Sequence, residues 1–148
     1  MKVKIRVADP AGNITIFVMT PLDRSRYAEA ANQLLEQREY KAEQVGFMEE
    51  MSNGTCRMQM MGGEFCGNAT RSFGYLKSLL DPDHPKLVEV DVSGSDSPLK
   101  VEVDLEAGTS RTAMPLPRKM ADLLVPGHGS CPMVCFEGIS HIIVNSYT

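Results

Sequence analysis

Alternating apolar and charged residues open the chain and predict a two-stranded hairpin. Residues 2–9 place Val3, Ile5 and Val7 on one face and lysine or arginine on the other, which is typical of a half-buried strand. Turn-forming residues follow at 9–13, and residues 14–19 form a second apolar stretch. We expect these two stretches to pair with each other.

Helical spacing then replaces the alternation. Residues 20–23 suit a helix start, and Tyr27, Ala30, Ala31 and Leu34 recur at helical spacing to about residue 37. Short strands are expected at 44–49 and 56–61. A second helical pattern follows the glycine-rich residues 62–67 and stops at Asp81-Pro82, because proline breaks a helix.

Three further strands are expected after this helix, at 88–92, at 99–105 and around 112–116. The connections are of hairpin length, and the order of elements becomes β-β-α-β-β-α-β-β-β. This order predicts the α+β class, with a mostly antiparallel sheet wrapped on a helix. Strands and helices do not alternate one by one, which argues against a doubly wound nucleotide-binding fold.

The last part of the chain contains a short segment with weak similarity to an earlier one. Residues 115–131 are rich in proline, glycine and small residues and predict a linker. Gly138–Val144 then matches Gly12–Val18 at the glycine, the apolar pair and the final valine, which indicates either a repeat or two similar hairpins. In a repeat, the second equivalent of Cys66 would fall at roughly residue 192. We therefore expect an N-terminal lobe at 1–117, and at 118–148 a linker and the first strands of a second lobe that is otherwise missing.

Composition restricts the function classes. The 148 residues are 43% hydrophobic and 23% charged, which is typical of a globular domain. The net charge is −4 and there is no lysine or arginine run, which argues against nucleic acid as a partner. No apolar run reaches the ~18 residues of a spanning helix, and the start is no signal peptide. We expect a cytoplasmic protein without a membrane partner, whose four cysteines are reduced thiols.

Cys66 is the first candidate for chemistry. It lies between a glycine-rich loop and the first turn of a helix, where unpaired N–H groups and the helix dipole favour a thiolate. The N–H groups of Gly67, Asn68 and Ala69 could hold a carboxylate beside it. A thiolate next to a bound carboxylate suits proton transfer at the adjacent carbon. The alternative is a buried structural cysteine.

The run from Gly62 to Arg71 resembles a family motif. It is similar to the Cys-Gly-Asn-Gly-Ala-Arg signature of diaminopimelate epimerase. It is closer still to the Gly-Gly-Glu-Phe-Cys-Gly-Asn-Ala form of epimerase-like amino-acid racemases, histidine racemases among them. Gly12-Asn13 and Gly138-Ile139-Ser140-His141 resemble two further family motifs in the same order. The resemblance covers essentially the whole chain.

The resemblance implies an amino-acid racemase or epimerase that uses no pyridoxal phosphate and no metal. Its fold would be two pseudo-symmetric lobes, each a curved sheet or barrel around a central helix, with one catalytic cysteine from each lobe facing the substrate. Cys66 would be one of these two bases, and the backbone of Gly67 and Asn68 would bind the α-carboxylate. Asn13 would contact the substrate, and His141 would lie near the site.

Departures from the family pattern leave alternatives open. The glycine-rich loop that carries the second catalytic cysteine of the family is not in this sequence. Ile139 replaces an asparagine that binds substrate in the family. A protein with only one of the two bases could be a module that binds an amino acid or a carboxylate without catalysis. Glu64 allows an isomerase of the phenazine-pathway type that uses this carboxylate as acid or base. We expect the 148 residues alone to be inactive and to form a homodimer or self-associate, since a cleft-facing apolar surface would be uncovered.

Two remaining features are assigned minor roles. His128, Cys131 and Cys135 could form a metal site, but their spacing matches no standard zinc pattern, so none is predicted. Arg71 is expected to cap the helix or to pair with another group, and not to act as a catalytic residue.

Overall fold

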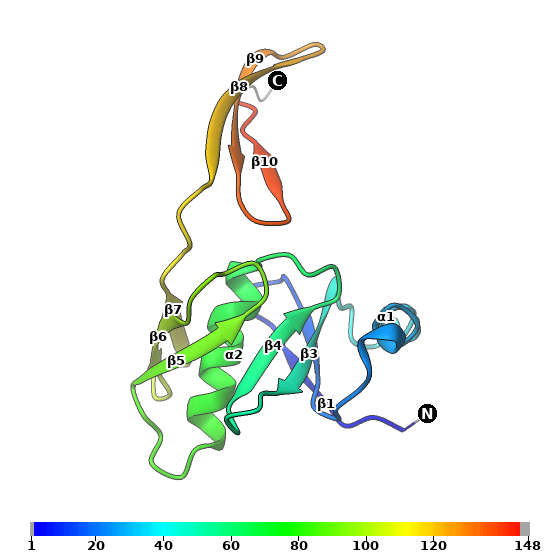
Figure 1. Cartoon of the computed structure of the whole chain (residues 1–148), viewed down its shortest axis with the longest axis vertical. Helices are drawn as coiled ribbons and strands as arrows, with labels where there is room; N and C mark the ends of the chain where they lie inside the picture. Colours follow the sequence, from blue (N-terminus) through cyan, green and yellow to red (C-terminus); the bar gives the residue numbers. More distant parts are fainter. Residues whose placement is uncertain (1, 146–148) are drawn as a thin grey trace.

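The computed structural model describes residues 2–145 and contains a large and a small sheet (Figure 1). The large sheet has seven strands that lie side by side in chain order. They are β1 (Ile5–Ala8), β2 (Thr15–Val18), β3 (Gln44–Glu50), β4 (Cys56–Met60), β5 (Leu87–Val92), β6 (Leu99–Asp104) and β7 (Thr109–Thr112). β2–β3 and β4–β5 pair in parallel and the other neighbours are antiparallel. The predicted α+β class and the mostly antiparallel sheet are confirmed.

Each parallel pair is connected by a helix, as parallel pairing requires. β2 leads through a 3-10 turn, η1 (Arg24–Arg26), and α1 (Tyr27–Leu35) to β3, and β4 leads through α2 (Gly67–Leu80) to β5. The first helix starts later than expected because Asp23 caps the 3-10 turn, accepting a hydrogen bond from the Ser25 N–H at 2.9 Å. The α2 prediction is confirmed, including its end at Asp81.

The two helices pack on opposite faces of the sheet, and the curl of the sheet encloses α2 (Figure 1). β2 is buried on both faces for this reason: Ile16 and Val18 pack with α1, whereas Phe17 packs with α2. α2 lies unusually close to β6, since a Cβ on Gly74 would come within 2.5 Å of the Cβ of Val101. The lack of a side chain at Gly74 therefore allows α2 to pack this closely against β6.

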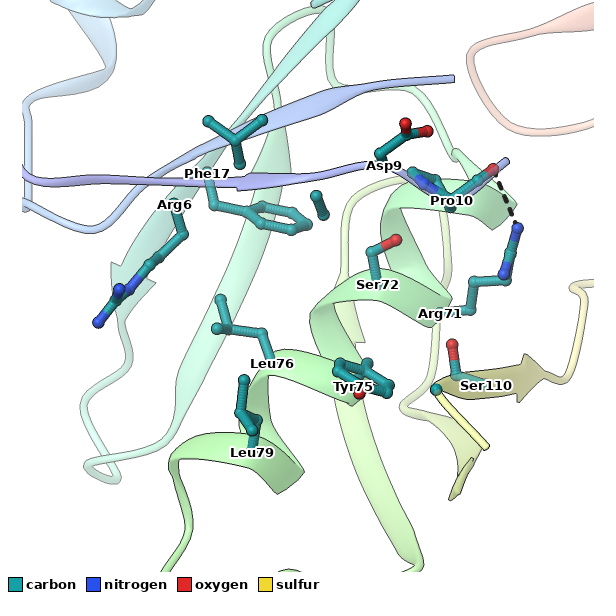
Figure 2. Close-up of a pocket in the computed structure, with 13 residues that line it drawn as sticks. Arg6, Asp9, Pro10, Phe17, Arg71, Ser72, Tyr75, Leu76, Leu79 and Ser110 are labelled. Carbon is teal, nitrogen blue, oxygen red and sulfur yellow. Dashed lines mark hydrogen bonds between the residues drawn. The ribbon is translucent and has the colours of Figure 1, made fainter. Parts of the chain in front are cut away.

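The curled sheet is open between its two edge strands, β1 and β7. A cavity of about 320 Å³ lies there, and Figure 2 shows it lined by Arg6 and Asp9 on one side, Ser110 on the other, and Tyr75 and Leu76 of α2 behind. At its end, the guanidinium of Arg71 donates a hydrogen bond to the carbonyl of Pro10 at 3.2 Å. This bond fixes the β1–β2 turn against the start of α2.

Two expectations for the region after β6 are corrected by the structure, one by a second, small sheet. It consists of β8 (Lys119–Val125), β9 (Gly129–Cys135) and β10 (Ser140–Ile142), joined antiparallel in the order β10-β9-β8. The linker predicted at 115–131 was wrong, because residues 119–125 pair with 129–135 around a glycine-containing turn. The strand expected at 112–116 lies instead at residues 109–112, in register with β6. No helix within residues 2–145 is long and apolar enough to cross a membrane.

Candidate active site

Cys66 is the N-cap residue of α2, as the sequence predicted. Its backbone is extended, with φ −132° and ψ 113°, and the N–H of Ala69 donates to its sulfur at 3.4 Å. The N–H of Thr70 donates to the Cys66 carbonyl at 2.9 Å. The N–H groups of Gly67 and Asn68 have no acceptor among residues 2–145, so the helix start keeps two donors for a ligand.

Gln44 at the start of β3 contacts the sulfur of Cys66. Its side-chain nitrogen lies 3.2 Å from the Cys66 sulfur, 2.7 Å from Thr15 Oγ1 and 3.1 Å from Asn13 Oδ1. Thr15 is the register partner of Gln44 across β2 and β3, which brings these groups together. An amide nitrogen carries two protons, so the three acceptors share them.

Asn13 and Asn68 extend this polar network. The side-chain nitrogen of Asn68 donates to Asn13 Oδ1 at 3.1 Å, and Asn13 in turn donates to Glu43 at 2.7 Å. Arg71 donates to Asn68 Oδ1 at 3.2 Å, one turn along α2. The network thus connects the β1–β2 turn, the start of β3 and the first turn of α2, three segments far apart in the sequence.

A cavity of about 620 Å³ opens beside Cys66, a volume typical of small-molecule sites. Its wall on the large-sheet side includes Cys66, Gly67 and Asn68, and its opposite wall includes Phe136, Ile139 and His141 from the β9–β10 hairpin. The rings of Phe136 and His141 meet edge to face at 5.9 Å. Four of the five predicted site residues line this cavity, and Asn13 reaches it through Gln44 and Asn68.

The small sheet contacts the large-sheet unit beside the cavity through one exposed ion pair and through close packing at the β9–β10 loop. Arg118 pairs with Glu137 in the β9–β10 loop and, at 3.4 Å, with Asp96 of the large-sheet unit. Gly138 at the tip of the hairpin packs on Glu64, and a Cβ there would be 3.3 Å from the Glu64 Cα. These contacts lie where His141, from the small sheet, shares the cavity with Cys66, Gly67 and Asn68 from the start of α2.

Gln44 and Arg71 are two of the site residues that the sequence did not predict. Gln44 contacts Cys66, yet in the sequence it is only a polar residue before an apolar strand. Arg71 was expected to cap or pair, and it does pair, but its position in the network could not be foreseen. The register of two parallel strands places Gln44, and that register is a non-local property.

The cysteines differ in their surroundings, and all four are free. Of the described cysteines, Cys66 is the one that lines the cavity. Burial raises the pKa of the Cys56 thiol on β4. Cys131 and Cys135 lie four residues apart on β9, roughly 13 Å along a strand, which is too far to share one ion. Within residues 2–145 no group of three or more metal-binding side chains is found.

A curled sheet surrounds a central helix whose first turn presents a cysteine and two N–H groups without an acceptor among the described residues, as expected for one lobe of an amino-acid racemase. The chain belongs to the family of the histidine racemase CntK N-terminal domain, whose model matches residues 2–148.

The relatives of this chain also include histidine racemases. Histidine racemases from two strains of Fusobacterium nucleatum subsp. nucleatum are 32% and 30% identical over 96% of this chain. A histidine racemase from Staphylococcus aureus is 46% identical over 44% of the chain and 25% of its own length. The chain spans 56% of the length of the two Fusobacterium relatives, which is about half of each protein.

Proposed function

We propose that this chain is the N-terminal part of a cofactor-independent histidine racemase and that Cys66 is one of its two bases. The observation that supports this most strongly is the position of the Cys66 sulfur, at a cavity wall beside the free N–H groups of Gly67 and Asn68. Those N–H groups bind the substrate α-carboxylate in this proposal. The Cα–H bond then lies within reach of the sulfur.

The proton balance needs two groups. The Cys66 thiolate takes the Cα proton and becomes a thiol, while the electron pair of the broken bond moves into the carboxylate. The N–H groups at the helix start and the helix dipole stabilise that negative charge. A second thiol on the opposite face gives its proton to Cα, which completes the inversion and leaves the second cysteine as thiolate.

The second base lies outside this chain in the proposal. Cys131 is buried on β9, and Cys135 is not among the residues that line the cavity. We therefore expect residues 1–148 alone to leave L-histidine unracemised, because one thiol reaches one face of the substrate. Chiral chromatography after long incubation measures this. Racemisation that Cys66→Ala abolishes would contradict the assignment of the second base to a missing lobe.

Ligand protection tests the site on the chain itself. L-histidine is expected to slow the alkylation of Cys66 by iodoacetamide, because the bound amino acid covers the sulfur. Cys56, on β4 and away from the cavity lining, serves as the internal control, and peptide mass spectrometry measures both rates. Equal Cys66 rates with and without saturating amino acid would overturn the proposed site.

A second experiment separates catalysis from simple binding. In the full-length protein, Cys66→Ser is expected to abolish racemisation of histidine and largely spare its binding, since the carboxylate is held by backbone. Retained racemisation would move the role of base to another group, with Glu64 first in line. A binding module without turnover would show protection of Cys66 and no Cα–H exchange in deuterated water.

A further inference from the structure

Met114 lies beside the first residue of α2, in the segment that connects β7 to β8. A Cβ on Gly67 would come 3.1 Å from the Met114 sulfur and 3.6 Å from its terminal methyl carbon. A Cα–Cβ bond in a helix is tilted toward the helix N-terminus, which is also the direction in which the N–H groups of the first turn point. The thioether therefore lies on the same side of Gly67 as the N–H groups of Gly67 and Asn68, which have no acceptor among the described residues.

The backbone next to Met114 is anchored on the large sheet. The N–H of Ala113 donates to the Lys100 carbonyl at 3.1 Å and continues the pairing of β6 with β7. Residues 113–117 form no helix or strand and connect the large sheet to the small one (Figure 1). Met114 thus starts from a fixed position, and its side chain is part of the lining of the cavity at Cys66.

The side chain of Met114 is open to solvent. It is 55% exposed, whereas Met48, Met58 and Met60 of the core are at most 5% exposed. The oxidation of a methionine follows its exposure, because the oxidant must reach the sulfur. A peroxide therefore reaches Met114 in the folded chain, without any local unfolding.

Oxidation changes what the Met114 sulfur offers to an N–H donor. A thioether sulfur is a weak hydrogen-bond acceptor, so it leaves the N–H groups of Gly67 and Asn68 without a strong partner. A peroxide transfers one oxygen atom to the sulfur, which loses two electrons and gains an S–O bond while the peroxide is reduced to water. The new oxygen is polar and accepts hydrogen bonds, and the start of a helix favours an atom with partial negative charge.

We propose that Met114 is a site of reversible oxidation and that the oxygen of its sulfoxide accepts hydrogen bonds from the N–H groups of Gly67 and Asn68. The same donors hold the substrate carboxylate in the proposed function, and the effect on the substrate rests on that function. Oxidation then lowers the affinity for the amino acid without a change at Cys66. Methionine sulfoxide reductase restores the affinity, because it returns the sulfur to the thioether with electrons from a thiol reductant and releases the oxygen as water.

The test compares the ¹⁵N-labelled chain before and after treatment with hydrogen peroxide. Cys66→Ser is the background, because it removes the thiol that peroxide would oxidise and keeps an N-cap acceptor. Peptide mass spectrometry identifies the oxygen added to Met114. The amide protons of Gly67 and Asn68 are expected to move downfield on oxidation, because they gain an acceptor, and to return after reductase treatment. L-histidine is expected to bind about tenfold more weakly to the oxidised chain, the effect of one lost hydrogen bond to a charged group.

Two leucine variants separate Met114 from the other exposed methionines. Met114→Leu nearly keeps the size of the side chain and removes the sulfur, so peroxide is expected to leave both amide signals and the histidine affinity unchanged. Met61→Leu is the matched control, since Met61 is 39% exposed in a turn and is not among the residues that line the cavity at Cys66. This control is expected to respond to peroxide in the same way as the background chain.

The outcomes separate the two proposals. If the amide signals of Gly67 and Asn68 stay in place when Met114 is oxidised, or move equally in Met114→Leu, the inference is overturned. If the signals move but histidine binds equally well before and after oxidation, or does not bind at all, the sulfoxide contact stands and the proposed carboxylate site is rejected alone.

Discussion

The side-chain nitrogen of Gln44 lies 3.2 Å from the sulfur of Cys66. This contact joins the first residue of β3 to the N-cap of α2, 22 positions later in the chain. Gln44 is held in turn by Thr15 across the parallel β2–β3 pair. The position of the proposed base therefore depends on the register of the sheet as well as on the helix that follows it.

Gln44→Leu is expected to destabilise the chain and to disturb Cys66. The variant removes donors to Thr15, Asn13 and Cys66, and a typical hydrogen bond contributes about 1 kcal/mol. A loss of roughly 1–2 kcal/mol lowers the melting temperature by about 2–8 °C at this chain length. Calorimetry measures the shift, and the alkylation rate of Cys66 reports the local change. An unchanged Cys66 rate would show that Gln44 does not position the sulfur.

Cys66 is expected to be alkylated faster than Cys56 between pH 7 and 8. Burial raises the pKa of the Cys56 thiol, so little of its reactive thiolate is present in this range. Cys66 lines an open cavity, and the Ala69 N–H points at its sulfur. Peptide mass spectrometry after timed iodoacetamide treatment gives both rates. Equal rates would count against a thiolate role for Cys66.

Local signals in the sequence were sufficient to predict α2 and its N-cap residue. The glycine-rich run before Cys66 and the proline after Asp81 bracket the helix that the structure shows at Gly67–Leu80. The same local reasoning failed at residues 115–131, where glycine and proline suggested a linker. There the pairing of β8 with β9 outweighs composition, because Gly127 and Gly129 adopt positive φ in a tight turn.

The site was predictable where its residues sit in one segment and not where distant segments meet. Cys66, Gly67 and Asn68 belong to one motif, and the structure places them together. The register of β2 and β3 places Gln44 at the site. His141 lines the cavity from a hairpin whose Gly138 packs on Glu64. Contacts of this kind depend on topology, which one sequence does not specify residue by residue.

Gly74→Ala is expected to destabilise the protein although alanine favours helices. Helix propensity alone predicts a gain of about 1 kcal/mol. The new Cβ would, however, lie 2.5 Å from the Val101 Cβ, and overpacking of this kind costs about 1–3 kcal/mol. Urea denaturation measures the net loss. Val101→Ala removes the Cγ1 and Cγ2 contacts at 2.5 and 2.7 Å but keeps the Cβ contact, so the loss in the double variant should be moderately smaller than the sum of the two single losses.

Glu49→Gln is expected to change the acid dependence of stability. The hydrogen bond from Arg24 holds the pKa of Glu49 below its ordinary value of 4.5, and Tyr27 adds a second hydrogen bond. A lowered pKa gives stability that is present above 4.5 and is lost as the pH falls through the folded-state value. The variant is therefore less stable at pH 7, and its difference from wild type shrinks toward pH 3.

Urea denaturation at several pH values measures this difference. Glu106→Gln, at an exposed turn without a carboxylate contact of this kind among the described residues, should follow the wild-type curve. If the difference in free energy of unfolding between wild type and Glu49→Gln stays constant from pH 7 to pH 3, the Arg24 contact does not make stability depend on pH.

The 148-residue chain is expected to self-associate through its small sheet. Met120 and Leu124 are 70% and 79% exposed, and residues four apart on a strand point to the same face. Ile142 on β10 is also exposed but lies on the opposite face, since its register partner Met133 pairs with Ala121. An uncovered apolar face on a small sheet favours association, because contact removes it from water. Sedimentation velocity should show species larger than a monomer that increase with concentration, and replacing Met120 and Leu124 by lysine should restore the monomer. A wild-type chain that stays monomeric across the same concentrations would contradict this expectation.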